Sequence, residues 1–388
     1  MTALVLDHRA SNRTWDRFVL PGVILALGLW TALAAGYRVI TLPDGNQTAD
    51  YLINWEGGPV RRGALGSLLL VLPVDGVSLL WVVAALQVGL LLALYGAVAY
   101  LAASYAPSWN LAILVLSPAF LLFPVLNPAE SARKELFGLV ALALLGISVR
   151  RRIWGWLPWV AIGTFTIGVW AHEVNVLLLP SVLALGVIAA RRGLVTKSWA
   201  VAWGIVVASI ALSALVFSLI FPADSRISAE LCRSLINRGL TADYCGGAVT
   251  LLAMSPLDAL RWVVTWYPAY FLYIPLGAMA LLAVYLWAPQ RWTWWLFAVQ
   301  WGALIPLFIF AIDYGRWIYV GISAVTLVIL ATGRSSASRQ PRVPWPFALA
   351  YVGFWSLPAV TPVVQDPLLT RMIGHAFLQA LPWVNRVL

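Results

Sequence analysis

Long apolar runs fill this sequence, and its charged residues gather at the points where those runs end. The runs reach about 20 residues, the length at which an α-helix crosses the hydrocarbon core of a bilayer. Four charged clusters lie between them, at residues 44–62, 130–135, 172–173 and 313–316. When the runs are aligned as successive membrane crossings, all four clusters fall on the same side. The sequence therefore predicts a bundle of helices with one polar site at one end.

Composition excludes a soluble fold for these runs. Hydrophobic residues make up 62% of the chain, charged residues only 10%, and the mean hydropathy is +0.87. A soluble core could not bury so much apolar surface, and a segment in lipid must satisfy its own backbone hydrogen bonds. We therefore predict an all-α, polytopic integral membrane protein in which residues 1–388 form a single transmembrane domain. The eleven expected spans are 18–36, 77–104, 108–126, 135–149, 153–171, 174–190, 199–221, 262–287, 293–312, 317–332 and 345–363.

The distribution of arginine predicts how these spans are oriented. Short loops rich in Arg and Lys stay on the cytoplasmic side of a membrane. The alternation of spans then requires an inside N-terminus and an outside C-terminus, and the net charge of +10 reflects topology. We expect no nucleic-acid partner. The basic segments on the inner side are 9–17, 150–152, 191–197, 291 and 334–342.

The first outer loop, residues 37–76, has an unusual form. A short apolar run at 63–73 follows its polar part. As a helix this run would be about 16 Å long, about half of what a span needs. We therefore expect an interfacial or re-entrant helix that holds the neighbouring charges against the outer membrane surface. Those charges are Asp50, Glu56, Arg61 and Arg62; Asp44, in Pro43-Asp44-Gly45-Asn46, is typical of a turn.

The other charged clusters are predicted to be recessed at the membrane edge, because the apolar runs close tightly around them. Ionisable groups at such depth are costly and are candidates for function. Structural roles are the alternative. Asp313 could pair with Arg316 three residues later. Glu173 could neutralise an arginine, and His172 could donate a hydrogen bond to a carbonyl. The recessed candidates are Glu130, Arg133, Lys134, Glu135, His172, Glu173, Asp313 and Arg316.

Several basic residues face outward, against the general arginine pattern, and this favours a phosphate ligand. A guanidinium group binds phosphate through two parallel hydrogen bonds. The sequence contains no nucleotide-binding glycine loop, zinc-ligand spacing or serine nucleophile elbow, so no cofactor is indicated with certainty. The sequence neither requires nor excludes a divalent metal ion, because oxygen ligands are available but no residue spacing demands one. The outward basic residues are Arg61, Arg62, Arg133, Lys134 and Arg316.

The longest hydrophilic outer loop, residues 222–260, contains both cysteines of the chain, Cys232 and Cys245. Two cysteines alone in an oxidising compartment, closing a small loop, favour a disulfide. Two free thiols are the alternative. We expect the bond to brace the loop rather than to take part in chemistry.

In layout, the chain resembles the C-type membrane glycosyltransferases (GT-C). Asp50, in Thr48-Ala49-Asp50-Tyr51, lies where the catalytic acid of that family lies, and Glu130 or Glu135 matches its second outer loop. Asp50 is followed by Tyr51, so the acidic pair typical of the family is lacking. The size, span number and outward arginines are also similar to O-antigen polymerases of the Wzy type. Either resemblance implies a sugar donor linked to polyprenyl phosphate or diphosphate.

Together these features predict glycosyl transfer at the outer, periplasmic face of a bacterial cytoplasmic (inner) membrane. The partners would be a lipid-linked sugar donor, a glycan or lipid acceptor of cell-envelope polysaccharide assembly, and the surrounding membrane lipids. Asp50 is the expected base, with Glu173 and Glu56 as further catalytic candidates, and the other outward charges would bind substrate. A secondary transporter or flippase of lipid-linked sugars is the alternative, although the sequence shows no internal repeat of the kind such proteins carry.

Overall fold

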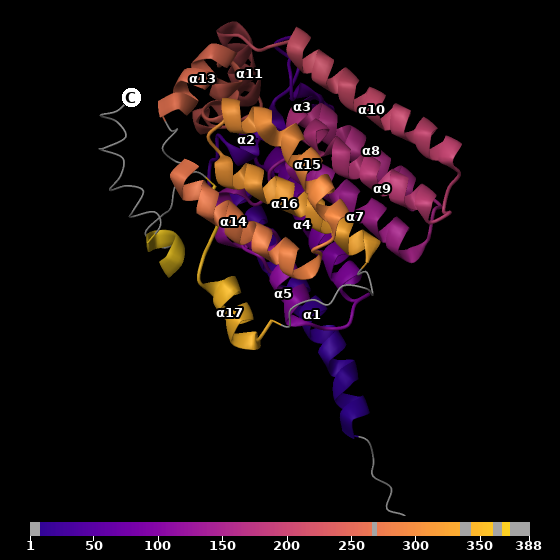
Figure 1. Cartoon of the computed structure of the whole chain (residues 1–388). Coiled ribbons are helices and arrows are strands. Elements are labelled where there is room, and N and C mark those ends of the chain that lie inside the picture. The colour runs from indigo at the N-terminus through magenta and orange to yellow at the C-terminus, as the bar shows by residue number, and fades with distance from the viewer. Residues whose placement is uncertain (1–7, 266–269, 334–342, 360–366, 373–388) are drawn as a thin grey trace, which may run out of the picture.

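The structure, a computed structural model, describes residues 8–265, 270–333, 343–359 and 367–372 (Figure 1). Every regular element within these ranges is a helix, as the sequence predicts. The longer helices are α1 (His8–Thr41), α4 (Gly76–Ala102), α7 (Glu135–Arg151), α8 (Leu157–Ala171), α9 (Leu179–Arg191), α10 (Lys197–Ile220), α11 (Ser225–Asn237), α13 (Pro256–Thr265), α14 (Tyr270–Trp287), α15 (Arg291–Phe310) and α16 (Tyr314–Thr332). The short ones are α2 (Gln47–Leu52), α3 (Gly63–Leu70), α5 (Trp109–Val115), α6 (Leu122–Leu126), η1 (Pro128–Glu130), η2 (Glu173–Leu178), η3 (Ala242–Cys245), α12 (Ala248–Leu252) and α17 (Trp345–Gly353).

Six helices in the described part of the chain are long and apolar enough to cross a membrane. A seventh crossing is present if the bent pair 242–252 and 256–265 is one span. A helical membrane protein is therefore supported, while the count of eleven spans stays a prediction. The six are Arg17–Thr41, Gly76–Ala102, Glu173–Arg191, Lys197–Ile220, Arg291–Phe310 and Tyr314–Thr332.

The core of the bundle is built around α16, whose apolar window is 94% buried. Helix α7 packs on α16, α4 and α8. Gly146 lets α7 approach closely, because a Cβ at this position would lie 3.3 Å from the Cβ of Ala331. The windows of α10 and α15 are at least as apolar as that of α16 but only 22% and 17% buried. Their exposed hydrophobic faces would be unfavourable in water and are suited to lipid.

Three of the expected spans do not correspond to one described helix each. The run 108–126 breaks into α5 and α6, because Pro118 cannot continue the α-helical hydrogen bonding and the chain turns at Ser117 instead. The run 345–363 begins with the nine-residue α17, and residues 360–366 lie outside the described part. The run 262–287 contains the end of α13 and all of α14, with 266–269 between them likewise not described.

Charge is segregated between the two ends of the bundle. Every Asp and Glu between residues 17 and 359 lies at the end that carries α2, α3, α11 and α13, which we call the mixed-charge end. The other end, where α7, α9 and α16 finish, carries arginines and Lys197 and no acidic residue from the same range; we call it the basic end. In Figure 1 the mixed-charge end is at the top and α5 and α17 mark the bottom.

Candidate functional site

Five elements deliver the charged residues of the candidate site to one place. Helix α2 carries Asp50, the turn before α3 carries Arg61 and Arg62, and the start of α7 carries Lys134 and Glu135. Two helix breaks complete it. The chain bends at His172, where the backbone becomes extended between α8 and η2 (φ −160°, ψ 124°), and again at Asp313, just before α16. The predicted fold-back near residue 172 and the predicted meeting of the four clusters are both present.

Asp50 and Lys134 form the floor of this site. Asp50 is 2% exposed and Lys134 is fully buried. The ammonium of Lys134 lies 3.6 Å from Oδ1 of Asp50 and donates hydrogen bonds to the carbonyls of Ala171 (3.1 Å) and Arg62 (3.3 Å). Neither carboxylate oxygen of Asp50 has a hydrogen-bond partner within the described residues. A buried carboxylate without donors is costly, so this group is held in place by the charge beside it.

Burial and neighbouring charges act in opposite directions on this pair. Burial would raise the pKa of Asp50, but the charges of Lys134 and Arg62 outweigh it and hold the pKa below its ordinary value. Burial lowers the pKa of Lys134 despite the attraction of Asp50. Asp50 therefore remains ionised and able to accept a proton.

Arg62 and Glu173 lie above this floor and are partly exposed. Nε of Arg62 donates to both carboxylate oxygens of Glu173 at 2.9 Å, and Nη2 donates to Oε1. Arg62 has φ 65°, a left-handed conformation that is unfavourable for a residue with a side chain and persists only where its surroundings hold it. The hydrogen bond from Lys134 to the carbonyl of Arg62 and the ion pair of the Arg62 side chain with Glu173 hold the backbone in this conformation. Of the roles considered for Glu173, the structure shows that of an arginine partner.

Arg61 is the least neutralised arginine of the site. Its Nη1 lies 3.7 Å from Glu173, its Nη2 donates to the carbonyl of Leu252 (3.1 Å), and its Nε has no partner among the described residues. Burial and the adjacent Arg62 lower the pKa of Arg61. This guanidinium can therefore gain most from an added anion.

On the other side of the floor, Glu135 and Arg316 form a buried pair. Arg316 also donates from Nη1 to Asp313 at 3.0 Å, which is the structural pairing considered for these two residues. Nε2 of His172 lies 4.0 Å from Glu135, while its Nδ1 accepts from the backbone N–H of Val174 (3.2 Å). Burial and Arg62 lower the pKa of His172 to about 4, so the ring is neutral at physiological pH.

Glu130 and Arg133 form a separate pair at the rim. Nε and Nη2 of Arg133 donate to the two carboxylate oxygens of Glu130 at 2.7 and 2.8 Å. Burial and Arg316 act in opposite directions on nearby Asp313; burial is the larger effect and its pKa is raised. The rim thus presents a neutralised ion pair and a carboxylate that protonates more readily than usual.

The structure does not bring Glu56 into this cluster. Glu56 accepts hydrogen bonds from Ser234 and from Nη2 of Arg238 (2.9 Å), and its side chain is 48% exposed. These contacts tie the segment at residues 37–76 to α11, which is joined to η3 by a disulfide between Cys232 and Cys245. Glu56 therefore occupies a structural position beside the braced loop. The Ser234 hydrogen bond and Arg238 lower its pKa.

Asn175 is an important residue that sequence reasoning did not single out. Its side-chain amide donates to the carbonyls of Lys134, Gly168 and His172, and its oxygen accepts from Gly138. One buried side chain thus joins α7, α8 and η2 directly under the site. The sequence did contain a signal for this role: Asn175 is an amide residue in an otherwise apolar run, and the side chain packs against glycines at positions 138 and 168.

Tyr51 is a second such residue. Its hydroxyl is buried without a hydrogen-bond partner among the described residues, and its ring lies beneath the ammonium of Lys134, 6.0 Å from the ring centroid. Burial beside Asp50 and Glu135 raises its pKa well above 10. A neutral phenol next to a donor-poor carboxylate provides a hydrogen-bonding group for a polar ligand.

No group of three or more His, Cys, Asp or Glu side chains arranged to hold a metal ion occurs in the described ranges. Comparisons with known proteins found no matching family model, no matching curated protein and no matching solved structure. The chemistry of the site must therefore be argued from its own residues.

Proposed function

We propose that this chain is a multi-pass membrane enzyme that transfers a glycosyl group from a polyprenyl-phosphate or polyprenyl-diphosphate donor to a glycan or lipid acceptor. The observation that carries the proposal is the buried Asp50 carboxylate, which has no hydrogen-bond donor among the described residues and a lowered pKa, and which lies close to the arginines of the site. Such a group is expensive to maintain for packing alone. It is suited to receiving a proton in a site shielded from water.

In the proposed reaction Asp50 accepts the proton of an acceptor hydroxyl as that oxygen attacks the anomeric carbon of the donor. The bond between the anomeric carbon and the phosphate oxygen breaks, and the electron pair leaves with the phosphate. Nearby cations stabilise the negative charge that develops on the leaving group. Lys134 lies 3.6 Å from Asp50. In the proposal its positive charge keeps the Asp50 carboxylate ionised before the reaction, and it stays beside the protonated acid afterwards.

Arg61 and Arg62 are the proposed phosphate ligands. A guanidinium fork that holds the carboxylate of Glu173 can hold a phosphate with the same geometry. Binding of the donor would replace Glu173 by phosphate on Arg62 and open the route to Asp50 below. Arg61 supports this exchange, because its charge is only weakly neutralised in the structure.

The proposed orientation places the mixed-charge end outside the cell and the basic end in the cytoplasm. Short arginine-rich loops lie at the basic end, at residues 150–152 and 191–197, and this supports the assignment through the positive-inside rule. The proposed location is therefore the bacterial cytoplasmic membrane, with the site facing the periplasm. The eleven-span topology, with an inside N-terminus and an outside C-terminus, belongs to the same proposal.

The direct test is Asp50→Asn in proteoliposomes, assayed with a panel of labelled polyprenyl-phosphate and polyprenyl-diphosphate sugars. The variant should retain donor binding and lose transfer by at least about 100-fold, the lower range for a removed general base. Asp75→Asn is the matched control, because this carboxylate lies at the same end but is 68% exposed and outside the cluster. Full turnover by Asp50→Asn would overturn the assignment. Movement of labelled lipid across the bilayer without sugar transfer would instead support the flippase alternative.

A further inference from the structure

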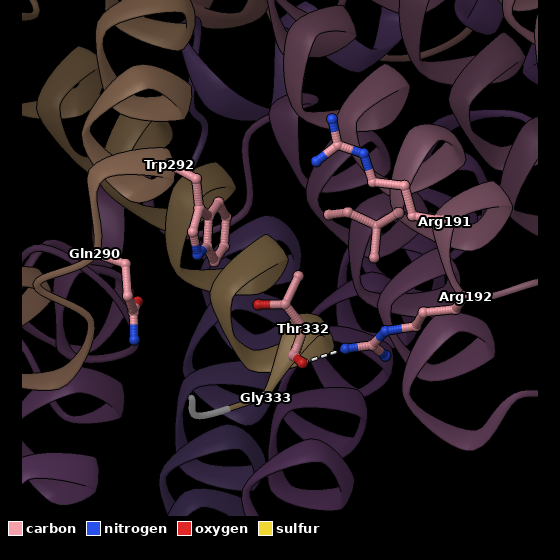
Figure 2. A pocket seen from close by; sticks show the side chains of 7 residues that line it. Arg191, Arg192, Gln290, Trp292, Thr332 and Gly333 are labelled. Atoms are coloured by element: carbon pink, nitrogen blue, oxygen red, sulfur yellow. Dashed lines mark hydrogen bonds between the residues drawn. The ribbon is translucent and has the colours of Figure 1, made fainter. Parts of the chain in front are cut away.

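A second polar feature lies at the basic end, far from Asp50. Helix α16 has 19 residues and runs from one end to the other, so the two regions are about 28 Å apart along it. A pocket of about 320 Å³ opens there between the ends of α9 and α16 and the start of α15 (Figure 2). Its walls include Ile188, Arg191, Arg192, Gln290, Trp292 and Thr332.

Arg192 supplies charge to this pocket, and no carboxylate of the described residues forms an ion pair with it. Its guanidinium donates to the carbonyls of Val149 (3.1 Å), Ala331 (3.3 Å) and Thr332, and the last of these bonds is drawn in Figure 2. These acceptors are neutral. Burial is the main cause of the lowered pKa of Arg192, and the positive charge of Arg150 lowers it further.

Arg191 faces the pocket with its hydrogen-bonding capacity unused. It is exposed, and its side chain makes no hydrogen bond or ion pair with the residues that the structure describes. In Figure 2 it lies across the pocket from the indole of Trp292. An arginine, an aromatic ring with an N–H donor and an aliphatic wall at Ile188 thus surround one space.

We propose that this pocket binds the phosphodiester headgroup of an anionic phospholipid. No Asp or Glu between residues 17 and 359 lies at this end, so no carboxylate from that range neutralises the arginines of the pocket. The pocket lies where membrane-crossing helices end, the level of lipid headgroups, and tryptophan is favoured at that level. Basic pockets between helices on the cytoplasmic side bind such headgroups. Ile188 would contact the glycerol and upper acyl chain.

This binding site is independent of the glycosyl-transfer proposal. It requires only that the helices span a membrane, and its ligand is part of the bilayer rather than a substrate. Full transfer by Asp50→Asn would overturn the glycosyl-transfer proposal without affecting lipid binding at Arg191, so the two proposals can fail separately.

The test is native mass spectrometry of the full-length protein in detergent, titrated separately with phosphatidylglycerol, phosphatidylcholine and inorganic phosphate. Phosphatidylglycerol should bind more tightly than phosphatidylcholine. Arg191→Gln should weaken its binding about fivefold, since one arginine near an anionic headgroup contributes about 1 kcal/mol. Lys197→Gln is the matched control, because it removes one charge from an exposed position at the same end outside the pocket. A thermal unfolding curve for each variant verifies that it is folded.

Three results would overturn the proposal. Equal affinity for the two lipids would show no headgroup selection. Equal weakening by Arg191→Gln and Lys197→Gln would show diffuse surface attraction in place of a pocket. Displacement of phosphatidylglycerol by inorganic phosphate at comparable concentration would show a site for free phosphate rather than for lipid.

Discussion

The two ends of this bundle use arginine in different ways. At the mixed-charge end, Arg62 and Arg316 are paired with carboxylates from other elements. At the basic end, Arg192 and Arg150 donate to backbone carbonyls where helices finish. The second arrangement follows from the helix dipole and the unsatisfied carbonyls of the last turn. The first requires buried acids, which membrane insertion disfavours. Arginine content alone therefore marks topology, whereas a buried carboxylate marks a candidate site.

Substitution of Lys134, the cation at the floor of the site, tests the difference between the two ends of the bundle with the largest expected effect. Lys134→Met would leave Asp50 buried without its nearest countercharge, and loss of one partner of a buried pair costs about 3–5 kcal/mol. Unfolding in detergent, followed by circular dichroism, should show that loss. The double variant Asp50→Asn/Lys134→Met should recover most of it. At the basic end, Arg192→Met should cost less, because no charge is left unpaired there.

If the double variant were no more stable than Lys134→Met alone, Asp50 would not be the group that Lys134 stabilises. The hydrogen bonds of Lys134 to the carbonyls of Ala171 and Arg62 would then carry its contribution. A cost for Arg192→Met equal to that for Lys134→Met would remove the distinction between the two ends.

A pH titration of stability tests the neutral His172 at the same floor. Its pKa is about 4 in the folded protein and about 6.5 when unfolded. The unfolded state therefore binds more protons between these values, and stability should fall as pH decreases from about 6.5 to about 4. The slope should be at most about 1.4 kcal/mol per pH unit. His172→Gln should flatten this part of the profile, and an unchanged slope in that variant would contradict a buried neutral histidine.

Sequence reasoning located the helices and the meeting of the charged clusters, because apolar runs and their interruptions are local signals. Charges placed where runs end must gather at the ends of a bundle, and the breaks at His172 and Asp313 follow. The run at 108–126 was misjudged because its hydrophobicity hides the effect of Pro118. Hydropathy measures affinity for lipid and carries no information on whether a helix is continuous.

Pairing within the site could not be predicted from the sequence. Several arginines were available to Glu173, and only the three-dimensional packing of α3 against α8, which ends just before Glu173, selects Arg62. The same limit applies to Glu56, which lies close to Asp50 in sequence but turns toward Arg238, 182 residues further along the chain. The bridging role of Asn175 depends on helix packing of the same kind.

The disulfide offers a test of how the mixed-charge end is covered. The structure joins Cys232 and Cys245, which are 13 residues apart. Mass spectrometry without reduction should find these residues in one linked peptide pair. Cys232→Ser/Cys245→Ser should cost about 3 kcal/mol through the added freedom of the unfolded loop. Quantitative alkylation of both cysteines in native membranes would exclude the bond. The basic end contains no disulfide among the described residues, so reduction should leave lipid binding there unchanged.

The smallest expected effect comes from a substitution that keeps charge and changes only shape. Arg62→Lys retains a cation beside Glu173 but loses the two-pronged donor geometry that a phosphate would also require. Transfer activity should fall about tenfold, equivalent to about 1.4 kcal/mol of transition-state stabilisation. The same exchange at the basic end, Arg192→Lys, should leave kcat/KM for transfer unaltered, since this residue contacts carbonyls far from Asp50. Wild-type kinetics in both Arg61→Lys and Arg62→Lys would remove the phosphate role, and the pairing with Glu173 would then be purely structural.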